Sequence, residues 1–304
     1  MKHFFITLTI LLSCATSIFA TDTVDDYFKK CRQSNSSDYA TVNKIVSAFD
    51  SEKLLKALSP YYSDSVLFVR RQAYYLTYKK GIQNKVGENT SIVSRLVMGL
   101  NDSDNGLRGM ILGYLQSFLS SDFDTEAQTI IVEQLKSVNR PHHDQLLLLA
   151  GFVGAGREEL LNLLLKPELP TRKKWNIALA LARIGDEKQV NYCVEKVRQA
   201  PINSGMVSYL LPDLVYTRQK AALDYCVELL YSDKKLCATA NPNLSDDILC
   251  AYPIIELLAP VIVDFPVKVD AGIGINTNDY PKMLQTVRDW FNANKDYRIQ
   301  TDIY

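Results

Sequence analysis

The chain has 304 residues but only three histidines, and it carries no net charge. Its 34 basic and 34 acidic side chains cancel, so no field of one sign draws it toward nucleic acid or an anionic membrane. His142 and His143 are adjacent, and neighbouring helical residues point about 100° apart, unlike zinc ligands spaced four residues apart. We expect a helix N-terminus here instead, with Pro141 in its first turn.

Motifs that carry chemistry are also missing from the sequence. It contains no serine nucleophile elbow, phosphate loop or calcium loop. The glycines of AGIG at 271–274 lack the third glycine of a dinucleotide site and predict a turn. The two acids of GREEL at 156–160 stand at a predicted helix start, where they stabilise the helix dipole. We therefore predict no catalytic, cofactor-binding or metal-ligating residues.

The N-terminal residues contain a predominantly apolar run. Residues 1–20, MKHFFITLTILLSCATSIFA, combine a basic start, an apolar run and a small final residue, which is typical of a signal peptide. The stretch is too short for a membrane span, and the later run at 254–265 is interrupted by charge and proline. We expect a secreted or periplasmic protein. The alternative is a lipoprotein acylated at Cys14, because LLSC at 11–14 loosely matches a lipoprotein cleavage box.

Internal repetition is the most informative feature of the sequence. VNYCVEKV at 190–197 returns as LDYCVELL at 223–230, a shift of 33 residues that is typical of helix-pair repeats. Each copy follows another apolar segment, so the repeating unit is predicted to be two antiparallel helices joined by a short turn. Upstream, the pair Val69-Arg70 returns 38 residues later as Leu107-Arg108. These periods predict an all-α fold.

The stretch KKWNIALALARIGDEKQV at 173–190 is apolar on nearly all sides and ends at a glycine followed by an acid. A helix inside a stack can be apolar all round, because its own partner and both neighbouring repeats cover it. Gly185 is predicted to end this helix in a left-handed conformation, and Asp186 to begin the next one.

With its alanines and leucines at helical spacing and its isoleucine-glycine-aspartate turn, this stretch resembles HEAT repeats of the phycocyanobilin-lyase type. The resemblance covers roughly residues 38–231. It implies a right-handed α-solenoid of stacked antiparallel helix pairs, an armadillo-like helical array that binds other proteins. It supplies no catalytic residues to transfer.

The ends of the chain depart from this pattern. We predict an N-terminal helical cap at 21–63, HEAT-like repeats at 64–231, and a C-terminal repeat at 232–304. The last part is expected to contain a long loop, an irregular segment and a capping helix at 281–295, PKMLQTVRDWFNANK, whose apolar residues form one stripe.

Five cysteines remain outside the predicted signal peptide. Cys237 and Cys250 bracket the long loop and are expected to form a disulfide worth about 3 kcal/mol, with two free thiols as the alternative. Cys193 and Cys226 occupy equivalent places in successive repeats, and helices packed 8–10 Å apart are too distant for a bridge, so both are predicted core residues. Cys31 either pairs with another molecule or stays reduced.

One surface is a candidate for partner binding. Arg70, Tyr74 and Tyr78 follow one another at four-residue spacing on a predicted helix, and arginine and tyrosine concentrate binding energy at interfaces. The sequence favours the other interpretation, in which these side chains pack between repeats, with tyrosine rings buried and hydroxyls solvated.

The sequence favours a non-enzymatic exported scaffold that binds a protein partner through its helical repeats. The alternative is an exported enzyme, a lyase or glycoside-processing protein, on an α/α helical array, using carboxylates or tyrosines brought together by folding.

Overall fold

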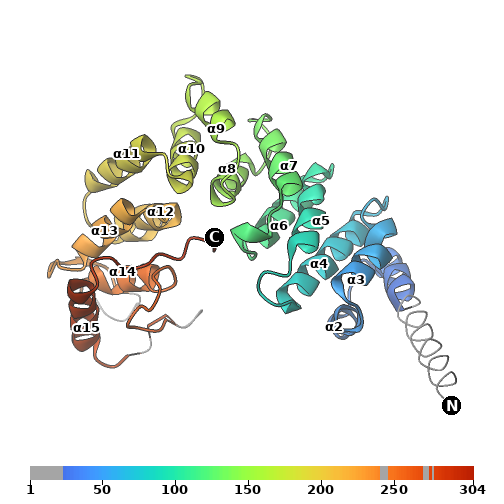
Figure 1. The fold of residues 1–304 in the computed structure, drawn as a ribbon. Helices are drawn as coiled ribbons and strands as arrows, with labels where there is room; N and C mark the ends of the chain where they lie inside the picture. Colours follow the sequence, from blue (N-terminus) through green and yellow to red (C-terminus); the bar gives the residue numbers. More distant parts are fainter. Residues whose placement is uncertain (1–22, 240–245, 270–273, 276) are drawn as a thin grey trace, which may run out of the picture. The chain divides into compact units, whose positions relative to one another are not determined.

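The computed structural model describes residues 23–239, 246–269, 274–275 and 277–304. Over these residues the chain is mostly helical, with one short two-stranded sheet, which confirms the all-α prediction (Figure 1). No helix in this described part has both the length and the apolar character of a membrane span. The predicted signal peptide, with Cys14, lies outside the described residues.

The chain divides into two compact units, residues 1–142 and 143–304. This division falls inside the region predicted as repeats, 64–231. It lies where His142 adopts a left-handed backbone with φ 65°. A helix begins here as expected from the sequence, but its first residue is His143, which is buried, and Pro141 lies in a turn before it and not in the first helical turn as predicted.

Unit 1 is built of short helices whose starts are capped by aspartates. The side chains of Asp38, Asp50, Asp104 and Asp124 each accept hydrogen bonds from backbone N–H groups of the helix that follows. A helix over residues 23–34 precedes α2. The labelled elements are α2 (Tyr39–Ala48), α3 (Ser51–Leu58), η1 (Ser59–Tyr61), α4 (Leu67–Gln83), α5 (Thr90–Met98), η2 (Gly99–Asn101), α6 (Asn105–Leu115), η3 (Ser120–Asp122) and α7 (Thr125–Leu135).

Unit 2 continues the helical pattern and adds the short sheet. Its elements are α8 (His143–Phe152), α9 (Arg157–Leu164), α10 (Thr171–Ile184), α11 (Glu187–Arg198), a π-helical turn η4 (Met206–Leu210), α12 (Leu211–Thr217), α13 (Lys220–Leu229), β1 (Lys235–Cys237), β2 (Ile248–Leu249), α14 (Ala251–Leu258) and α15 (Tyr280–Ala293).

Helix α10 is buried on nearly all sides because four helices surround it. Every residue from Asn176 to Arg183 is buried, and α10 packs against α8, α9, α11 and α12. Gly185 ends the helix with φ 97°, and the Asp186 side chain accepts from the N–H of Gln189 at the start of α11. The predicted boundaries of this helix pair are confirmed.

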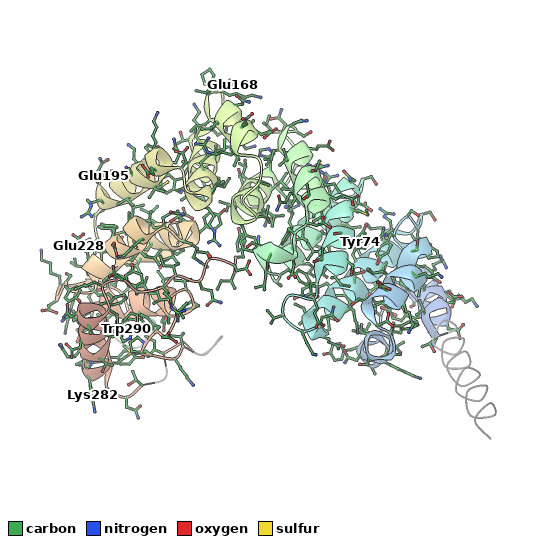
Figure 2. All side chains as sticks on the ribbon, in the orientation of Figure 1. Tyr74, Glu168, Glu195, Glu228, Lys282 and Trp290 are labelled. Atoms are coloured by element: carbon green, nitrogen blue, oxygen red, sulfur yellow. A yellow bond between two sulfur atoms is a disulfide. The ribbon has the colours of Figure 1, made fainter. Side chains whose placement is uncertain are left out.

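The two copies of the 33-residue repeat pack on each other. Helix α11 contacts α13, and Arg198 of α11 forms an ion pair with Glu228 of α13 at 3.0 Å. The Arg198 guanidinium also lies 4.4 Å from the ring centroid of Tyr225. Figure 2 marks Glu195 and Glu228, which occupy equivalent places on these two helices.

The predicted disulfide between Cys237 and Cys250 is present, with the two Cα atoms 5.1 Å apart. It joins the antiparallel strands β1 and β2, directly before α14 begins. Cys31, Cys193 and Cys226 are free and buried, so the core role predicted for Cys193 and Cys226 is confirmed.

The final helix, α15, buries the side chains of Met283, Leu284, Val287 and Phe291 and contacts α14. This stripe agrees with the one read from the sequence, although Trp290 is only half-buried.

Candidate functional site

The three residues predicted as a partner-binding patch pack between the helices of unit 1. Arg70 donates two hydrogen bonds to the Asp102 carboxylate, from Nε at 2.7 Å and from Nη2 at 3.0 Å. Tyr74 is only 5 % exposed and lies against Tyr62, inside the helices of unit 1 (Figure 2). Tyr78 stacks on Tyr114 with ring centroids 4.1 Å apart. These contacts favour the packing interpretation, so we place the partner-binding surface elsewhere.

The 38-residue period of unit 1 is explained by a ladder of arginines and aspartates. Arg32 pairs with Asp64, and Arg70, 38 residues later, pairs with Asp102. Arg70 also donates to the main-chain oxygen of Asp64 at 2.8 Å, and Arg108 donates in the same way to that of Asp102. The arginine that marks the repeat in the sequence therefore connects one helix pair to the next.

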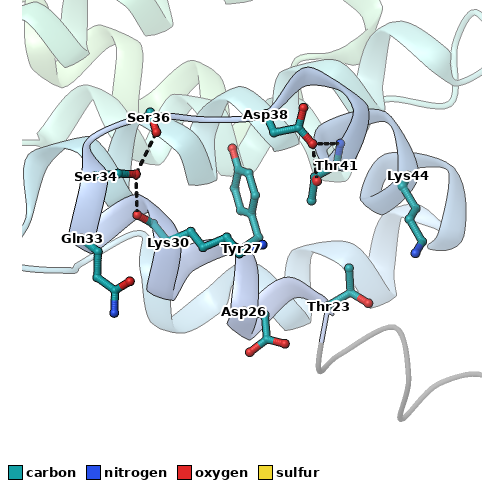
Figure 3. Close-up of a pocket in the computed structure, with 10 residues that line it drawn as sticks. All are labelled: Thr23, Asp26, Tyr27, Lys30, Gln33, Ser34, Ser36, Asp38, Thr41 and Lys44. Carbon is teal, nitrogen blue, oxygen red and sulfur yellow. Dashed lines mark hydrogen bonds between the residues drawn. The ribbon is translucent and has the colours of Figure 1, made fainter.

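A polar cavity of about 450 Å³ lies between the helix over residues 23–34 and α2 (Figure 3). Several of its polar groups already have partners within unit 1. The Asp38 carboxylate accepts from the N–H and hydroxyl of Thr41, and the Tyr27 hydroxyl donates to Gln72 at 2.6 Å. Two lysines and two aspartates in the lining mix both charges, so the cavity does not select a ligand of one sign.

Unit 2 gathers three equivalent side chains from successive helix pairs. Phe152, Arg183 and Tyr216 each lie two residues before a residue with a left-handed backbone. These left-handed residues are Gly154 (φ 72°), Gly185 (φ 97°) and Arg218 (φ 53°). The guanidinium of Arg183 lies between two aromatic rings, 5.5 Å from each ring centroid, in cation–π contact with Phe152 and Tyr216.

A second arginine stands where the preceding repeat has glycine. Arg218 follows Gly185 by 33 residues and ends α12 as Gly185 ends α10. Its Nη1 donates to the carbonyl of Val215 within its own turn, which holds the guanidinium in place. Phe152, Arg183, Tyr216 and Arg218 together form what we call the arginine site.

The arginine site holds the segment of residues 300–304 in this structure. Arg183 Nη2 donates to the carbonyls of Thr301 and Ile303, both at 2.7 Å. Arg218 donates to the main-chain oxygens of Gln300 at 3.1 Å and Tyr304 at 2.6 Å. Figure 1 shows the red end of the chain passing beside α12. The two guanidinium groups thus donate hydrogen bonds to four main-chain oxygens of this segment.

The ring of Tyr304 completes the contact with the arginine site. Its centroid lies 5.4 Å from that of Phe152 and 5.7 Å from that of Tyr216. Tyr216 is itself fixed, because its hydroxyl donates to the carbonyl of Leu148 in α8 at 2.6 Å. The ring of Tyr304 therefore contacts a side chain, Tyr216, whose position is fixed between α12 and α8.

No family model matches this chain, and comparison with curated proteins gives no significant match. The arginine site is thus described by its own chemistry. Every hydrogen bond that Arg183 and Arg218 make within the described residues goes to a main-chain oxygen. Such bonds do not depend on which side chains residues 300–304 carry, whereas the aromatic contact depends on the ring of Tyr304.

Burial shapes the protonation of the arginine site. Loss of solvent lowers the pKa of Arg183, and it lowers that of Arg218 to about 10, while the pKa of Tyr304 is raised to about 12. Burial also raises the pKa of Tyr216 well above its usual value. At neutral pH both arginines are therefore cations and both tyrosines are neutral hydrogen-bonding groups.

Sequence reasoning missed the arginine site, although two signals for it were present. Arg183 interrupts the apolar pattern of ALALARIG, and Arg218 stands in the second copy where the first has glycine. The residues of the bound segment are more than 80 positions away from either arginine. A pattern within one repeat does not reveal such a distant partner.

One acidic residue of unit 2 has a perturbed environment. Burial raises the pKa of Asp213, although its carboxylate accepts a hydrogen bond from Trp175 Nε1 at 2.6 Å. In the part of the chain that the structure describes, no three His, Cys, Asp or Glu side chains gather as a metal site would require.

Proposed function

We propose that this chain is a non-enzymatic exported scaffold that binds a peptide segment of a partner protein through unit 2. The observation that supports the proposal is the arginine site, where two buried guanidinium groups donate hydrogen bonds to main-chain oxygens of residues 300–304. We further propose that its helix pairs are HEAT-like repeats forming a right-handed α-solenoid. The packing of α11 on α13 and the arginine–aspartate ladder of unit 1 support that architecture.

Rigid helices suit this kind of recognition. Arg183 and Arg218 come from consecutive helix pairs, so the donors have a fixed spacing that the backbone of a bound segment must match. Main-chain hydrogen bonds give affinity, while one pocket for a side chain gives specificity. Because the donors are buried, each bond is formed away from competing water.

Export is supported by the sequence of residues 1–20 and by the disulfide. A bond between Cys237 and Cys250 persists in an oxidising compartment such as the periplasm or the cell exterior. We propose secretion or periplasmic export, with a lipoprotein form as the alternative.

The test is capture of partners from the secreted or periplasmic fraction of the native cell. The bait is the whole chain, and the variant Arg183→Gln/Arg218→Gln removes the cations of the arginine site. Arg198→Gln is the matched control, because Arg198 is an exposed arginine on the other helix of a pair. We expect one partner that binds the parent chain and the control equally and is lost with the double variant. A partner retained by the double variant would contradict the proposal.

A second candidate function, an exported lyase or glycoside-processing enzyme, is favoured by Asp213 alone. A carboxyl with a raised pKa beside Trp175 is suited to proton transfer. This candidate requires turnover of a polysaccharide by the purified chain and its loss in Asp213→Asn. A measured turnover unaffected by that substitution would remove the role of Asp213.

A further inference from the structure

We propose that the 300–304 segment competes with a partner protein for the arginine site. The partner segment replaces it and places an aromatic side chain where Tyr304 lies. This inference rests on the proposed function and states which partner the site accepts. Its ligand is a peptide with one aromatic residue, bound through hydrogen bonds to its main-chain oxygens.

The first step is that the arginine site favours an occupied state. With residues 300–304 in place, Arg183 and Arg218 are both less than a tenth exposed. Removing this segment takes four oxygen acceptors from the two cations and leaves them to water. Hydrogen bonds of charged groups are stronger than those of neutral groups. The site therefore favours a peptide occupant over open solvent.

The second step is that residues 297–300 are anchored to unit 2, whereas residues 301–304 can separate from it. Residues 297–300 are anchored to unit 2 by Gln300 N–H donating to Val261 at 2.8 Å and by Tyr297 donating to Asp224 at 2.7 Å. Ile299 also bridges to Ile262. From Thr301 onward, the segment lies at the surface: Thr301 is exposed, and Ile303 and Tyr304 are half-buried. The end can leave the arginine site while the base stays paired.

The third step concerns selectivity. Bonds to the main-chain oxygens of residues 300, 301, 303 and 304 do not depend on the side chains of the occupant. The Tyr304 ring, in contrast, meets two aromatic rings and lies beside a cation shared between them. Aromatic contacts of this kind add about 0.5–1.5 kcal/mol beyond area burial, which favours an aromatic side chain over an aliphatic one.

The backbone at Arg218 supports a binding role. A residue other than glycine with φ 53° is strained, and such strain concentrates at functional sites. The equivalent position in the preceding repeat is Gly185, which ends its helix without strain. The presence of arginine here is explained by its hydrogen bonds to the occupant of the site.

The experiment uses a fluorescent peptide with the sequence of residues 297–304, YRIQTDIY, and measures its binding to the whole chain by anisotropy. Tyr304→Ala weakens the intramolecular occupant, and we expect this variant to bind the peptide at least tenfold more tightly than the parent. Tyr209→Ala is the matched control, since Tyr209 is 76 % exposed and lies on η4; it should bind as the parent does.

A second peptide, with alanine in place of its last tyrosine, tests the aromatic requirement. It should bind the Tyr304→Ala chain at least tenfold more weakly than YRIQTDIY does. Should Tyr304→Ala prove unfolded by circular dichroism, Tyr304→Leu replaces it, with the same expected order.

Two results would overturn the inference. If YRIQTDIY binds neither the parent nor the variant, the 300–304 segment is a fixed part of unit 2. If both peptides bind equally, the arginine site does not select an aromatic residue. Neither result bears on the capture experiment above, in which loss of a partner with Arg183→Gln/Arg218→Gln still supports a binding scaffold.

Discussion

Arg218 occupies the position that glycine occupies one repeat earlier. Its backbone has φ 53°, whereas Gly185 adopts φ 97° at no steric cost. A left-handed conformation costs a residue with a Cβ atom about 1–2 kcal/mol. The guanidinium offsets this cost because it donates to Gln300 and Tyr304. At this residue, the free energy of the guanidinium hydrogen bonds outweighs the cost of the left-handed backbone.

Arg218→Gly separates these two contributions. The change relieves about 1–2 kcal/mol of strain but removes the hydrogen bonds of a charged donor to Gln300 and Tyr304, each worth about 1.5–3 kcal/mol, so we expect a net loss of about 1–5 kcal/mol in the free energy of unfolding by urea. The companion change, Gly185→Ala, should cost about 1 kcal/mol from backbone strain, because open space surrounds the new Cβ atom. An Arg218→Gly chain as stable as the parent would show that the guanidinium contributes nothing.

The free thiols are predicted to be inert in the folded chain. Burial raises the pKa of Cys193 and Cys226 to about 12 and also raises that of Cys31. At pH 8 only about one Cys193 thiol in ten thousand is ionised, and the thiolate is the reactive form. Iodoacetamide should therefore label none of the three in native protein and all three in denaturant, as read by peptide mass spectrometry. Rapid native labelling of Cys193 or Cys226 would contradict their burial.

At the scale of the element, helix α10 could be predicted because its signals are local. An apolar run of helical length, a glycine at its end and an aspartate two residues after Ile184 suffice to set its bounds. The disulfide followed equally from spacing, since Cys237 and Cys250 flank one loop.

Contacts between distant elements could not be predicted in the same way. The spacing of Tyr74 allowed both an exposed row and packing between repeats, and its contact with Tyr62 is known only from the structure. The short strands β1 and β2 also escaped prediction, since they are two or three residues long and pair across a loop. The arginine site depends on residues 300–304, which no repeat period links to α10.

The close approach of α8 and α10 gives a prediction about Gly151. A Cβ atom there would lie 2.6 Å from Ala180 Cα and 2.6 Å from the Tyr216 hydroxyl. Helix backbone cannot move aside cheaply, so Gly151→Ala should lower the free energy of unfolding by about 1–3 kcal/mol.

Gly113 provides the control for this substitution. A Cβ atom on Gly113 in α6 meets nothing within 4 Å, and Gly113→Ala should be neutral or stabilising by up to about 1 kcal/mol. Equal effects of the two changes in urea titrations would contradict the tight contact of α8 with α10.

At the scale of the whole molecule, the chain consists of two units with separate sets of internal contacts, residues 1–142 and 143–304. The disulfide belongs to the second unit. Units of this kind unfold separately when each has its own core.

Calorimetry under oxidising and reducing conditions tests this division. We expect two transitions, of which reduction lowers only one, by roughly 5–10 °C, because the closed loop contributes about 3 kcal/mol. The variant Cys237→Ser/Cys250→Ser should reproduce the reduced trace without reductant. A single transition that shifts as a whole would show that the two units unfold together.

The arginine site is the centre of the functional account, and photo-cross-linking from its occupant tests it most directly. A benzophenone amino acid replaces Tyr304 in the whole chain, and mass spectrometry locates the adducts after irradiation. We predict adducts on peptides containing Phe152 or Tyr216, and their loss when Arg183→Gln/Arg218→Gln is added. Adducts scattered over other surfaces, or unchanged by the double substitution, would contradict a segment held by these two arginines.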